Sequence, residues 1–440
     1  MPNSSLPIAL ATAFLGGEQH IDSVVARASE TIGQDWRWLR PLARRYLEAF
    51  QGKTRPRYRE VVQFLLHDEG LQHARAKHAL SVKHWVTELH PMQPVAAAAD
   101  WDIPPIESIG ALRDWLQLDM SELEWLADLK GLGYRQNGTR LQHYHYKVLS
   151  KRSGDIRLIE SPKAHLKEVQ RQILTRILDR IPVHPAAHGF RRRRSIKTYA
   201  ARHVARRVVL RMDVENFFPT FSGTRIQTFF RTAGYPEPVA DLLGGICTNA
   251  VPRGVWEQSY FDIDAAHRRE ARDLYARPHL PQGAPTSPML ANLCAYRIDC
   301  RLSGLAVSAA AEYTRYADDL AFSGDDAFHR RVDRFSEHVA PVLLEEGFRA
   351  HHRKTRIMRS GTRQYLVGLV INQKMNLVRK DLDTLKAILT NCIRSGPESQ
   401  NRDAHPAFRS HLEGRIAFAE MMNPTKGARL RNLFEKIQWQ

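Results

Sequence analysis

The chain has 440 residues, enough for two or three domains, and its 43% hydrophobic and 25% charged content is typical of a globular protein with a substantial core. Its 65 Lys and Arg residues outnumber 47 Asp and Glu residues, and the net charge of +18 favours a polyanionic partner, nucleic acid ahead of a membrane surface. No apolar run approaches the roughly 18 residues of a membrane span, and LPIALATAFLGG lacks a secretory signal's basic start, so we expect a cytoplasmic protein with no membrane partner.

The first part of the chain carries helical patterning and no catalytic motif. Apolar side chains recur at intervals of three and four between residues 36 and 66, so we expect residues 1–95 to form a small helical domain. Pro91, Pro94, Pro104 and Pro105 surround the run Ala96 to Ala99, so we expect residues 96–140 to form a linker followed by two short helices. Ser121 and Glu124 have the spacing of a capping box at the start of the second helix.

A hairpin and an amphipathic helix follow. HYHYKVLSKRSGDIRLIESP predicts two strands around a turn, with Lys151 and Arg152 near its tip and Arg157 on the return strand. Between residues 162 and 180, apolar side chains form one stripe and cations occupy the other faces. Four consecutive arginines come next: Arg191, Arg192, Arg193 and Arg194. Such a run is usually only solvated, yet these cations also suit a phosphate backbone.

Three aspartates lie at the ends of predicted strands. A hydrophobic run delivers Asp213 at its end, and YTRYADDLAFSG places Asp318 and Asp319 at the turn of a predicted hairpin. Neighbouring carboxylates repel each other and resist burial unless a cation offsets them, although a lone Asp-Asp pair is more often a solvated turn. Two strand-borne acid sites together are what two-metal phosphoryl transfer requires, because hard oxygen ligands hold the two Mg²⁺ ions.

The segments between and after these acids add a loop, a strand pair and helices. Residues 251–279 form a charged, helix-prone insertion to which the sequence assigns no role. In LPQGAPTSP, Gly283 allows backbone to approach a ligand closely, and a helix starts at Ser287. YLVGLVIN predicts a strand pair around Gly368, and the remaining chain is helical. Four cysteines without zinc or CxxC spacing argue against a disulfide framework.

In this order, the Asp213 segment, LPQGAPTSP and YADD resemble the palm motifs of reverse transcriptases, specifically the bacterial retron-like group. The resemblance runs from about residue 141 to the C-terminus. It implies an α+β right-hand polymerase fold, preceded by the helical domain and linker. Fingers are expected at 141–205, an antiparallel-sheet palm with fingers insertions and a primer grip at 206–372, and a helical thumb at 373–440.

The resemblance also implies roles for single residues. Two Mg²⁺ ions, or Mn²⁺ in their place, are assigned to Asp213, Val214, Asp318 and Asp319, of which the three acids are catalytic. The incoming deoxynucleoside triphosphate is assigned to Lys151, Arg152, Arg157, Phe218, Gln282, Gly283 and Lys354. The RNA template and DNA product are assigned to Arg191, Arg192, Arg193, Arg194, Tyr316 and Gly368. For Lys354, proton donation and simple phosphate attraction are both open.

Phe218 bears on the product, because a bulky aromatic there fills the space that a ribonucleotide's 2′-hydroxyl needs. DNA synthesis is therefore expected, whereas an RNA-dependent RNA polymerase would carry a small or acidic residue at this place. A basic nucleic-acid-binding protein without catalysis would have no need of three acids, a QG turn and a bulky aromatic in one order.

The class of reverse transcriptase is less constrained. Retron enzymes, which make RNA-linked multicopy single-stranded DNA, typically carry Val-Thr-Gly where this chain has LVG at 366–368. They also carry Asn-Ala-x-x-His where it has NAVPR at 249–253. Both departures favour a related enzyme of bacterial anti-phage defence that copies a structured non-coding RNA. A partner effector protein and a homo-oligomer are both open.

Overall fold

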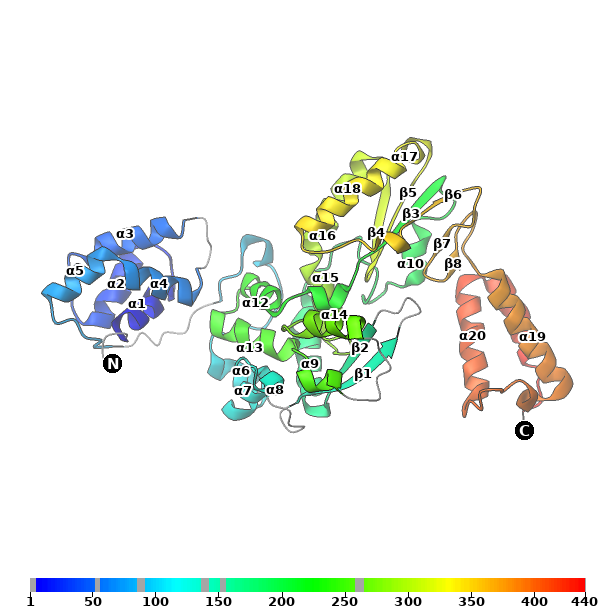
Figure 1. Ribbon diagram of the computed structural model, residues 1–440, viewed down its shortest axis with the longest axis horizontal. Helices are drawn as coiled ribbons and strands as arrows, with labels where there is room; N and C mark the ends of the chain where they lie inside the picture. The colour runs from blue at the N-terminus through cyan, green and yellow to red at the C-terminus, as the bar shows by residue number, and fades with distance from the viewer. Residues whose placement is uncertain are drawn as a thin grey trace. The chain divides into compact units, whose positions relative to one another are not determined.

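The structure, a computed structural model, describes residues 5–51, 56–84, 92–135, 142–150, 156–257 and 265–439. It mixes helices with antiparallel sheets (Figure 1), which confirms the expected α+β class. The chain divides into two compact units, which are described separately: Met1–Ile181 with Phe221–Ser287, and Pro182–Thr220 with Pro288–Gln440. In the described ranges, no helix has both the length and the apolar character needed to cross a membrane.

The first unit begins with five helices around an apolar core. They are α1 (Ser5–Leu15), α2 (Ile21–Ile32), α3 (Leu39–Ala49), α4 (Tyr58–His67) and α5 (Glu69–Lys77). Phe14, Leu42 and Tyr46 are buried in this core, and the ring of Phe14 meets that of Tyr46 edge-on at 4.9 Å. The spacing of three and four in the sequence therefore does mark the buried face of these helices.

Three short helices come next: α6 (Ile109–Leu116), α7 (Met120–Ala127) and α8 (Leu132–Arg135). The expected capping box at Ser121 and Glu124 is wrong by two residues. Asp119 accepts a hydrogen bond from the backbone N of Glu122 at 2.8 Å, and the Glu122 carboxylate accepts one from the backbone N of Asp119 at 3.1 Å. Asp is as good an N-cap as Ser, so the sequence alone did not distinguish a capping box that starts at Asp119 from one that starts at Ser121.

The predicted hairpin is present in the first unit. Strand β1 (Tyr144–Ser150) pairs antiparallel with β2 (Ile156–Pro162), and alternate side chains of β2 are buried. Ile156 and Leu158 pack against Trp256 and Tyr275 of the insertion, which forms helix α14 (Ala265–Tyr275). The insertion therefore supports the hairpin. The unit is completed by α9 (Ala164–Arg176), α12 (Gly223–Thr232) and α13 (Glu237–Cys247).

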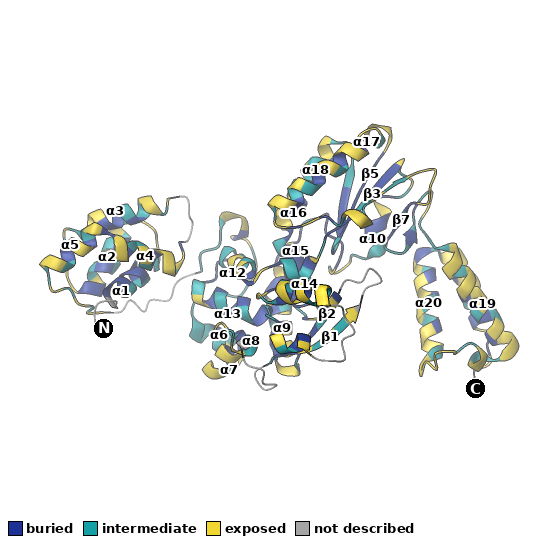
Figure 2. Ribbon diagram, in the orientation of Figure 1, coloured by how far each residue is buried: buried dark blue, intermediate teal, exposed yellow. Residues whose placement is uncertain are grey.

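The second unit is built on a four-stranded antiparallel sheet with strand order β4-β5-β3-β6 (Figure 1). The strands are β3 (Val208–Asp213), β4 (Glu312–Tyr316), β5 (Asp319–Gly324) and β6 (Arg356–Arg359). Every residue of β5 is buried, and β3 and β5 are dark in Figure 2. Helix α16 (Tyr296–Ser308) packs on β4 and α18 (Val332–Glu345) on β3, while Tyr199 of α10 (Ile196–Ala201) packs with Val209 and Ala321. These elements hold the central strands rigidly.

A small sheet and three helices end the second unit. The strand pair predicted around Gly368 is present as β7 (Tyr365–Leu366) and β8 (Leu369–Val370), joined by Val367 at φ 41° and Gly368 at φ 91°. Strand β9 (Asn376–Leu377) extends this sheet. Helices α19 (Arg379–Ser395), α20 (Phe408–Met422) and α21 (Pro424–Phe434) share an apolar core of their own.

Candidate active site

The three predicted acids meet at one edge of the four-stranded sheet. Asp213 is the last residue of β3 and lies opposite Asp319, the first residue of β5, in the antiparallel register. Asp318 sits in the turn between β4 and β5, and its carbonyl oxygen accepts a hydrogen bond from the backbone N of Val214 at 2.9 Å. The preceding Ala317 has φ 57°, so the turn is tight. Residues more than a hundred positions apart in the chain are thereby brought together.

Two cationic side chains form ion pairs with these acids. Arg211 donates to both carboxylate oxygens of Asp319, from Nε at 2.7 Å and from Nη2 at 2.9 Å. Lys354 donates from Nζ to the Asp213 carboxylate at 3.1 Å. Burial raises the pKa of Asp318 to about 6, and the negative charges of Asp213 and Asp319 add to the rise. The site is therefore a crowded set of carboxylates whose mutual repulsion is only partly compensated.

This donor set fits a divalent cation. In the described part of the chain, no three His, Cys, Asp or Glu side chains are already arranged around a metal position. However, carboxylate oxygens are the ligands that hard cations prefer, and the raised pKa of Asp318 marks acids whose repulsion a cation would relieve. Arg211 and Lys354 supply part of that positive charge here.

Aromatic side chains in the same unit include two of the predicted site residues. Phe218, on the short helix α11 (Phe217–Thr220), is half-buried, and its ring centroid lies 5.7 Å from that of Phe217 and 6.0 Å from that of Phe190. Phe190 in turn lies 6.5 Å from Tyr316. Sequence reasoning assigned no site role to Phe190, which is 43% exposed at φ 56°. The sequence feature that could have identified Phe190 is a large aromatic residue directly after a glycine in a basic segment.

The four consecutive arginines belong to the second unit as well. Arg192 and Arg193 are exposed, whereas Arg191 and Arg194 are half-buried. The guanidinium of Arg191 donates to the carbonyl of His184 at 3.5 Å, and burial together with Arg194 lowers its pKa. The run is therefore not uniformly solvated, because Arg191 is hydrogen-bonded and Arg194 is half-buried.

Of the remaining predicted residues, Arg157, Gln282 and Gly283 belong to the first unit and Gly368 to the second. Lys151 and Arg152 lie outside the described residues. Arg157 is exposed on β2. The carbonyl of Gln282 accepts a hydrogen bond from the backbone N of Glu160 at 3.0 Å. Gly283 has φ 142°, and a Cβ there would stand 2.7 Å from the Glu160 carbonyl oxygen. The backbone at Gly283 therefore packs closely against strand β2.

A buried charge network beside this loop was missed. His279 donates from Nε2 to the Glu160 carboxylate at 2.9 Å, and Asn249 donates to the same carboxylate at 2.8 Å. Burial by itself would lower the pKa of His279, but the adjacent Glu160 carboxylate leaves that pKa above its usual value. The sequence feature that could have revealed this network is the alternation of buried and exposed side chains along β2. Glu160 occupies the same buried face as Ile156 and Leu158.

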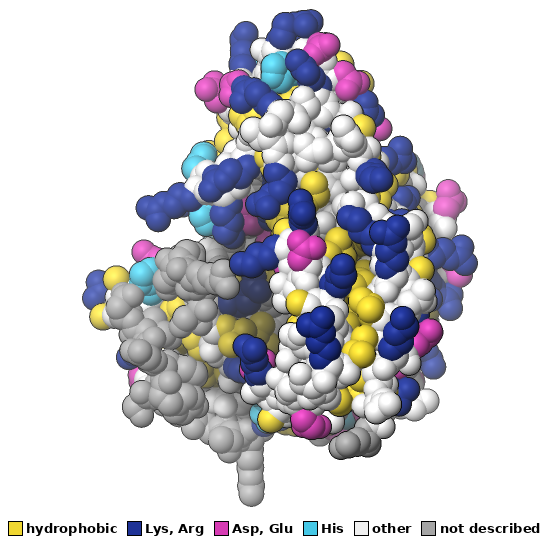
Figure 3. Space-filling view, turned by 90° about the vertical axis from the view of Figure 1, so that its right-hand side faces the viewer, with side chains coloured by type: hydrophobic (Ala, Val, Ile, Leu, Met, Phe, Trp, Pro, Cys, Tyr) yellow, Lys and Arg dark blue, Asp and Glu magenta, His cyan; other side chains and the backbone are white. Residues whose placement is uncertain are grey.

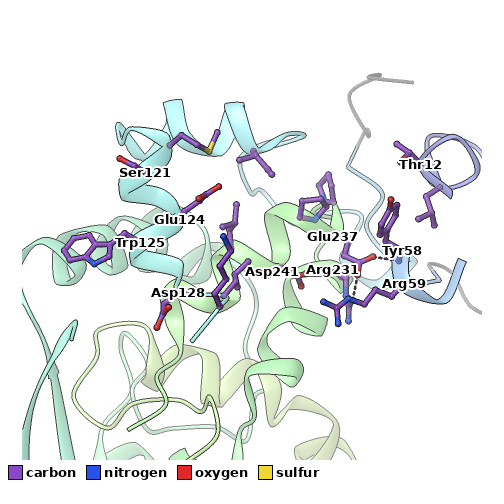
Figure 4. A pocket seen from close by; sticks show the side chains of 18 of the residues that line it. Thr12, Tyr58, Arg59, Ser121, Glu124, Trp125, Asp128, Arg231, Glu237 and Asp241 are labelled. Carbon is purple, nitrogen blue, oxygen red and sulfur yellow. Dashed lines mark hydrogen bonds and ion pairs between the residues drawn. The ribbon is translucent and has the colours of Figure 1, made fainter. Parts of the chain in front are cut away.

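A cavity of about 830 Å³ also lies in the first unit (Figure 4). Tyr58 comes from the N-terminal helices, Trp125 from α7 and Glu237 from the start of α13. The backbone N of Tyr58 donates to Glu237 at 2.6 Å across it. None of the predicted site residues lines this cavity, so its size is no guide to the chemistry.

Comparison with known proteins agrees with the geometry. Residues 149–371 match the family described as reverse transcriptase (RNA-dependent DNA polymerase). The retron Mx65 reverse transcriptase of Myxococcus xanthus is 39% identical over 292 residues, 66% of this chain and 64% of that protein. The retron Mx162 reverse transcriptase of the same species is 35% identical over 336 residues, 73% of this chain and 65% of that protein.

A third relative, the retron Ec86 reverse transcriptase of Escherichia coli, is 28% identical over 284 residues, 64% of this chain and 77% of that protein. The chain thus spans just under two thirds of the length of the two Myxococcus proteins. These relatives confirm the retron-like resemblance and give no support to the preference for a defence enzyme outside the retron class. The chain belongs to the reverse transcriptase family, and within it is similar to the retron enzymes.

Proposed function

We propose that the chain is an RNA-directed DNA polymerase that joins deoxynucleotides by two-metal nucleotidyl transfer. The observation that carries the proposal is the meeting of Asp213, Asp318 and Asp319 at the ends of adjacent strands. Reverse transcriptases as a family use divalent metal ions, and we assign two Mg²⁺ ions, with Mn²⁺ as a substitute, to these acids and Val214. The bound ions would activate the attacking 3′-hydroxyl and stabilise the pyrophosphate leaving group.

The chain's own residues would orient these groups. Arg211 holds both oxygens of Asp319, so that carboxylate is fixed in direction before substrate arrives. Lys354 lies on Asp213 and is the cation we assign to the leaving pyrophosphate. Phe218 is assigned to the sugar of the incoming nucleotide. Its ring is braced by Phe217, which supports a steric role.

Other assignments rest on the resemblance and on exposure. Arg157, Lys151 and Arg152 are assigned to the triphosphate, and Gln282 and Gly283 to the nucleotide pocket. The nucleic-acid strands are assigned to Arg191, Arg192, Arg193, Arg194, Tyr316 and Gly368. We further propose the division into helical domain (1–95), linker (96–140), fingers (141–205), palm (206–372) and thumb (373–440).

For the template we propose a dedicated, structured non-coding RNA, copied in the cytoplasm during anti-phage defence, with an effector protein or a second copy as a further partner. The names of the relatives favour a second form of this function, a retron enzyme that makes RNA-linked multicopy single-stranded DNA. Sequencing the nucleic acid that copurifies with the protein separates the two, because only the retron product is DNA joined covalently to RNA.

The test of catalysis is primer extension on an RNA template by the wild type and by Asp318→Asn and Asp319→Asn. Each substitution keeps the side-chain shape and removes a charged ligand, so extension should fall by at least about 100-fold, on the order of 2.7 kcal/mol of transition-state stabilisation. Asp325→Asn is the matched control, since the exposed Asp325 lies just past β5 and pairs only with Arg206 in the contacts described.

Stability should not fall with activity. Asp318→Asn relieves repulsion among the acids, so its melting temperature should equal or exceed that of the wild type. Undiminished extension by both Asn variants would contradict the metal assignment. A wild type that binds nucleic acid in a salt-sensitive way and extends no primer would indicate a non-catalytic binding protein.

A further inference from the structure

Strand β4 carries a buried arginine immediately before the catalytic turn. Arg315 has 1% of its side chain exposed, and Asp299, on α16, has none. Arginine is almost never fully buried unless it is paired. Here the pairing is bidentate: Nε donates to Asp299 Oδ1 at 2.8 Å and Nη2 to Oδ2 at 2.7 Å. Tyr313 donates to the same carboxylate at 2.9 Å, so Asp299 is held from two positions on β4.

The third nitrogen of the guanidinium points to the turn itself. Nη1 of Arg315 donates to the carbonyl oxygen of Ala317 at 3.2 Å and to Oδ1 of Asn292 at 3.0 Å. The Ala317 carbonyl belongs to the peptide group that joins Ala317 to Asp318. Because a peptide group is planar, a donor that fixes its oxygen also fixes the start of Asp318.

A second set of contacts, made by the segment of His188 and Gly189, also holds the turn. Asn292 donates through Nδ2 to the carbonyl of Gly189 at 2.8 Å. A Cβ on Gly189 would stand 2.7 Å from the backbone N of Ala317, so the glycine packs directly against the turn. The backbone of Arg315 pairs with the same segment, since its carbonyl accepts from the backbone N of His188 at 2.7 Å. The Arg315 guanidinium therefore contacts the turn directly at Ala317 and reaches Gly189, which packs against the turn, through Asn292.

The guanidinium of Arg315 also contacts the ring of Phe217, which packs against Phe218. Cζ of Arg315 lies 5.7 Å from the centroid of the Phe217 ring, within cation–π range, and Phe217 braces Phe218. Stability alone does not explain this arrangement, because a buried ion pair can often be replaced by apolar side chains of similar volume without loss. What apolar side chains cannot supply is a donor aimed at the Ala317 carbonyl.

We propose that Arg315 is a positioning residue for nucleotide addition, which fixes the Ala317–Asp318 peptide and hence the place of the Asp318 carboxylate. Asp299 holds the guanidinium in that direction. The proposal rests on the proposed function, since it concerns the same acids. It assigns Arg315 no contact with substrate or metal.

The test uses the full chain with the double substitution Asp299→Leu and Arg315→Met, which replaces the pair by apolar side chains. Steady-state primer extension should lose about 100-fold in kcat, since small displacements of catalytic groups are costly, while KM for the deoxynucleotide and affinity for the primer–template stay within about twofold. Melting temperature reports whether the variant folds. Arg301→Met is the control, because Arg301 lies on the same helix α16 and pairs with Glu345 and Glu346, away from the turn.

Should the double variant fail to fold, Arg315→Lys decides. Lysine keeps the buried positive charge beside Asp299, but its single nitrogen cannot reproduce the bidentate pair with Asp299 while also holding the Ala317 carbonyl, so kcat should still fall by about tenfold at unchanged KM. A folded variant with wild-type kcat, or a loss that appears in KM alone, overturns the positioning role. An inactive wild type would instead overturn the proposed function, so the two failures are distinguishable.

Discussion

At the scale of single residues, the role proposed for Phe218 depends on the part of its side chain that is exposed. Its ring is half-buried between Phe217 and Phe190, and the remainder is exposed. If that exposed part fills the space of a 2′-hydroxyl, the discrimination is steric and depends on side-chain size. Polarity should hardly matter, because no hydrogen bond is exchanged.

We therefore expect Phe218→Tyr to keep its preference for deoxynucleotides and Phe218→Ala or Phe218→Gly to accept ribonucleotides. The preference should fall by about tenfold or more in the small variants, on the order of 1.4 kcal/mol. Single-nucleotide extension with matched ribo- and deoxynucleoside triphosphates measures it. Unchanged selectivity in Phe218→Ala would mean that Phe218 is only a packing residue.

The three acids were predictable at this scale, and the buried Arg315 beside them was not. Asp213, Asp318 and Asp319 each follow or precede a hydrophobic run, so local pattern and motif order identify them. Arg315 stands beside the same motif, yet its sequence position reads as an ordinary charged strand residue. Its burial depends on Asp299, which lies in another element and which no local pattern connects to it.

At the scale of elements, two buried histidines join strands and loops with opposite pH dependence. His279 binds Glu160 of β2, and that carboxylate outweighs the effect of burial, so the His279 pKa is raised. His203 joins β4 to β5 through Thr314 and Ser323, and burial lowers its pKa to about 3. One histidine is therefore stabilising when charged and the other when neutral.

The signs give the pH windows. The folded state binds more protons at His279 than the unfolded state above about pH 6.5, so its contribution to unfolding free energy is present below that pH and is lost as pH rises through the raised pKa. For His203 the contribution is present above about pH 6.5 and is lost as pH falls, by about 1.4 kcal/mol per pH unit.

Urea unfolding of wild type, His279→Gln and His203→Gln across this range measures both effects, and amide hydrogen exchange locates each in its own unit. We expect the advantage of wild type over His279→Gln to shrink with rising pH, and that over His203→Gln to shrink with falling pH. Parallel curves for all three proteins would show that neither histidine titrates as its surroundings indicate.

Elements were predicted better than their boundaries. The apolar stripe after residue 162 does form a helix, but α9 begins at Ala164 and ends at Arg176. The capping box was displaced by two residues because Asp119 and Ser121 are equivalent caps in sequence. The insertion carried no local signal of its role, since that role is contact with Ile156 and Leu158 on β2.

At the scale of the whole molecule, the excess of cations is the most general property. On the face shown in Figure 3, Lys and Arg side chains outnumber Asp and Glu. Exposed cations of α19 to α21 include Lys386, Arg394, Lys426 and Arg429. Binding to a phosphate backbone through such groups releases counterions, so affinity must fall steeply with salt.

We expect the slope of log affinity against log salt to decrease by roughly one unit for each phosphate contact removed. The variant is Arg192→Gln with Arg193→Gln, which neutralises the two exposed arginines of the run. Its matched control is Arg330→Gln with Arg331→Gln, a second exposed adjacent pair in the same unit. Filter binding of an RNA–DNA primer–template across salt concentrations measures both. Equal slopes for the two variants would show that the four consecutive arginines do not contact the nucleic-acid backbone.

Arg211 and Lys354 have a consequence for how the protein matures. Because these side chains already form ion pairs with Asp319 and Asp213, the sheet can fold with its acids partly neutralised before a metal ion binds. Folding and metal loading are then separate events, unlike in small metal-dependent domains where the ion is part of the fold. Under the proposed function, the chain could therefore fold in a metal-poor state and gain activity only when divalent cations and substrate arrive together.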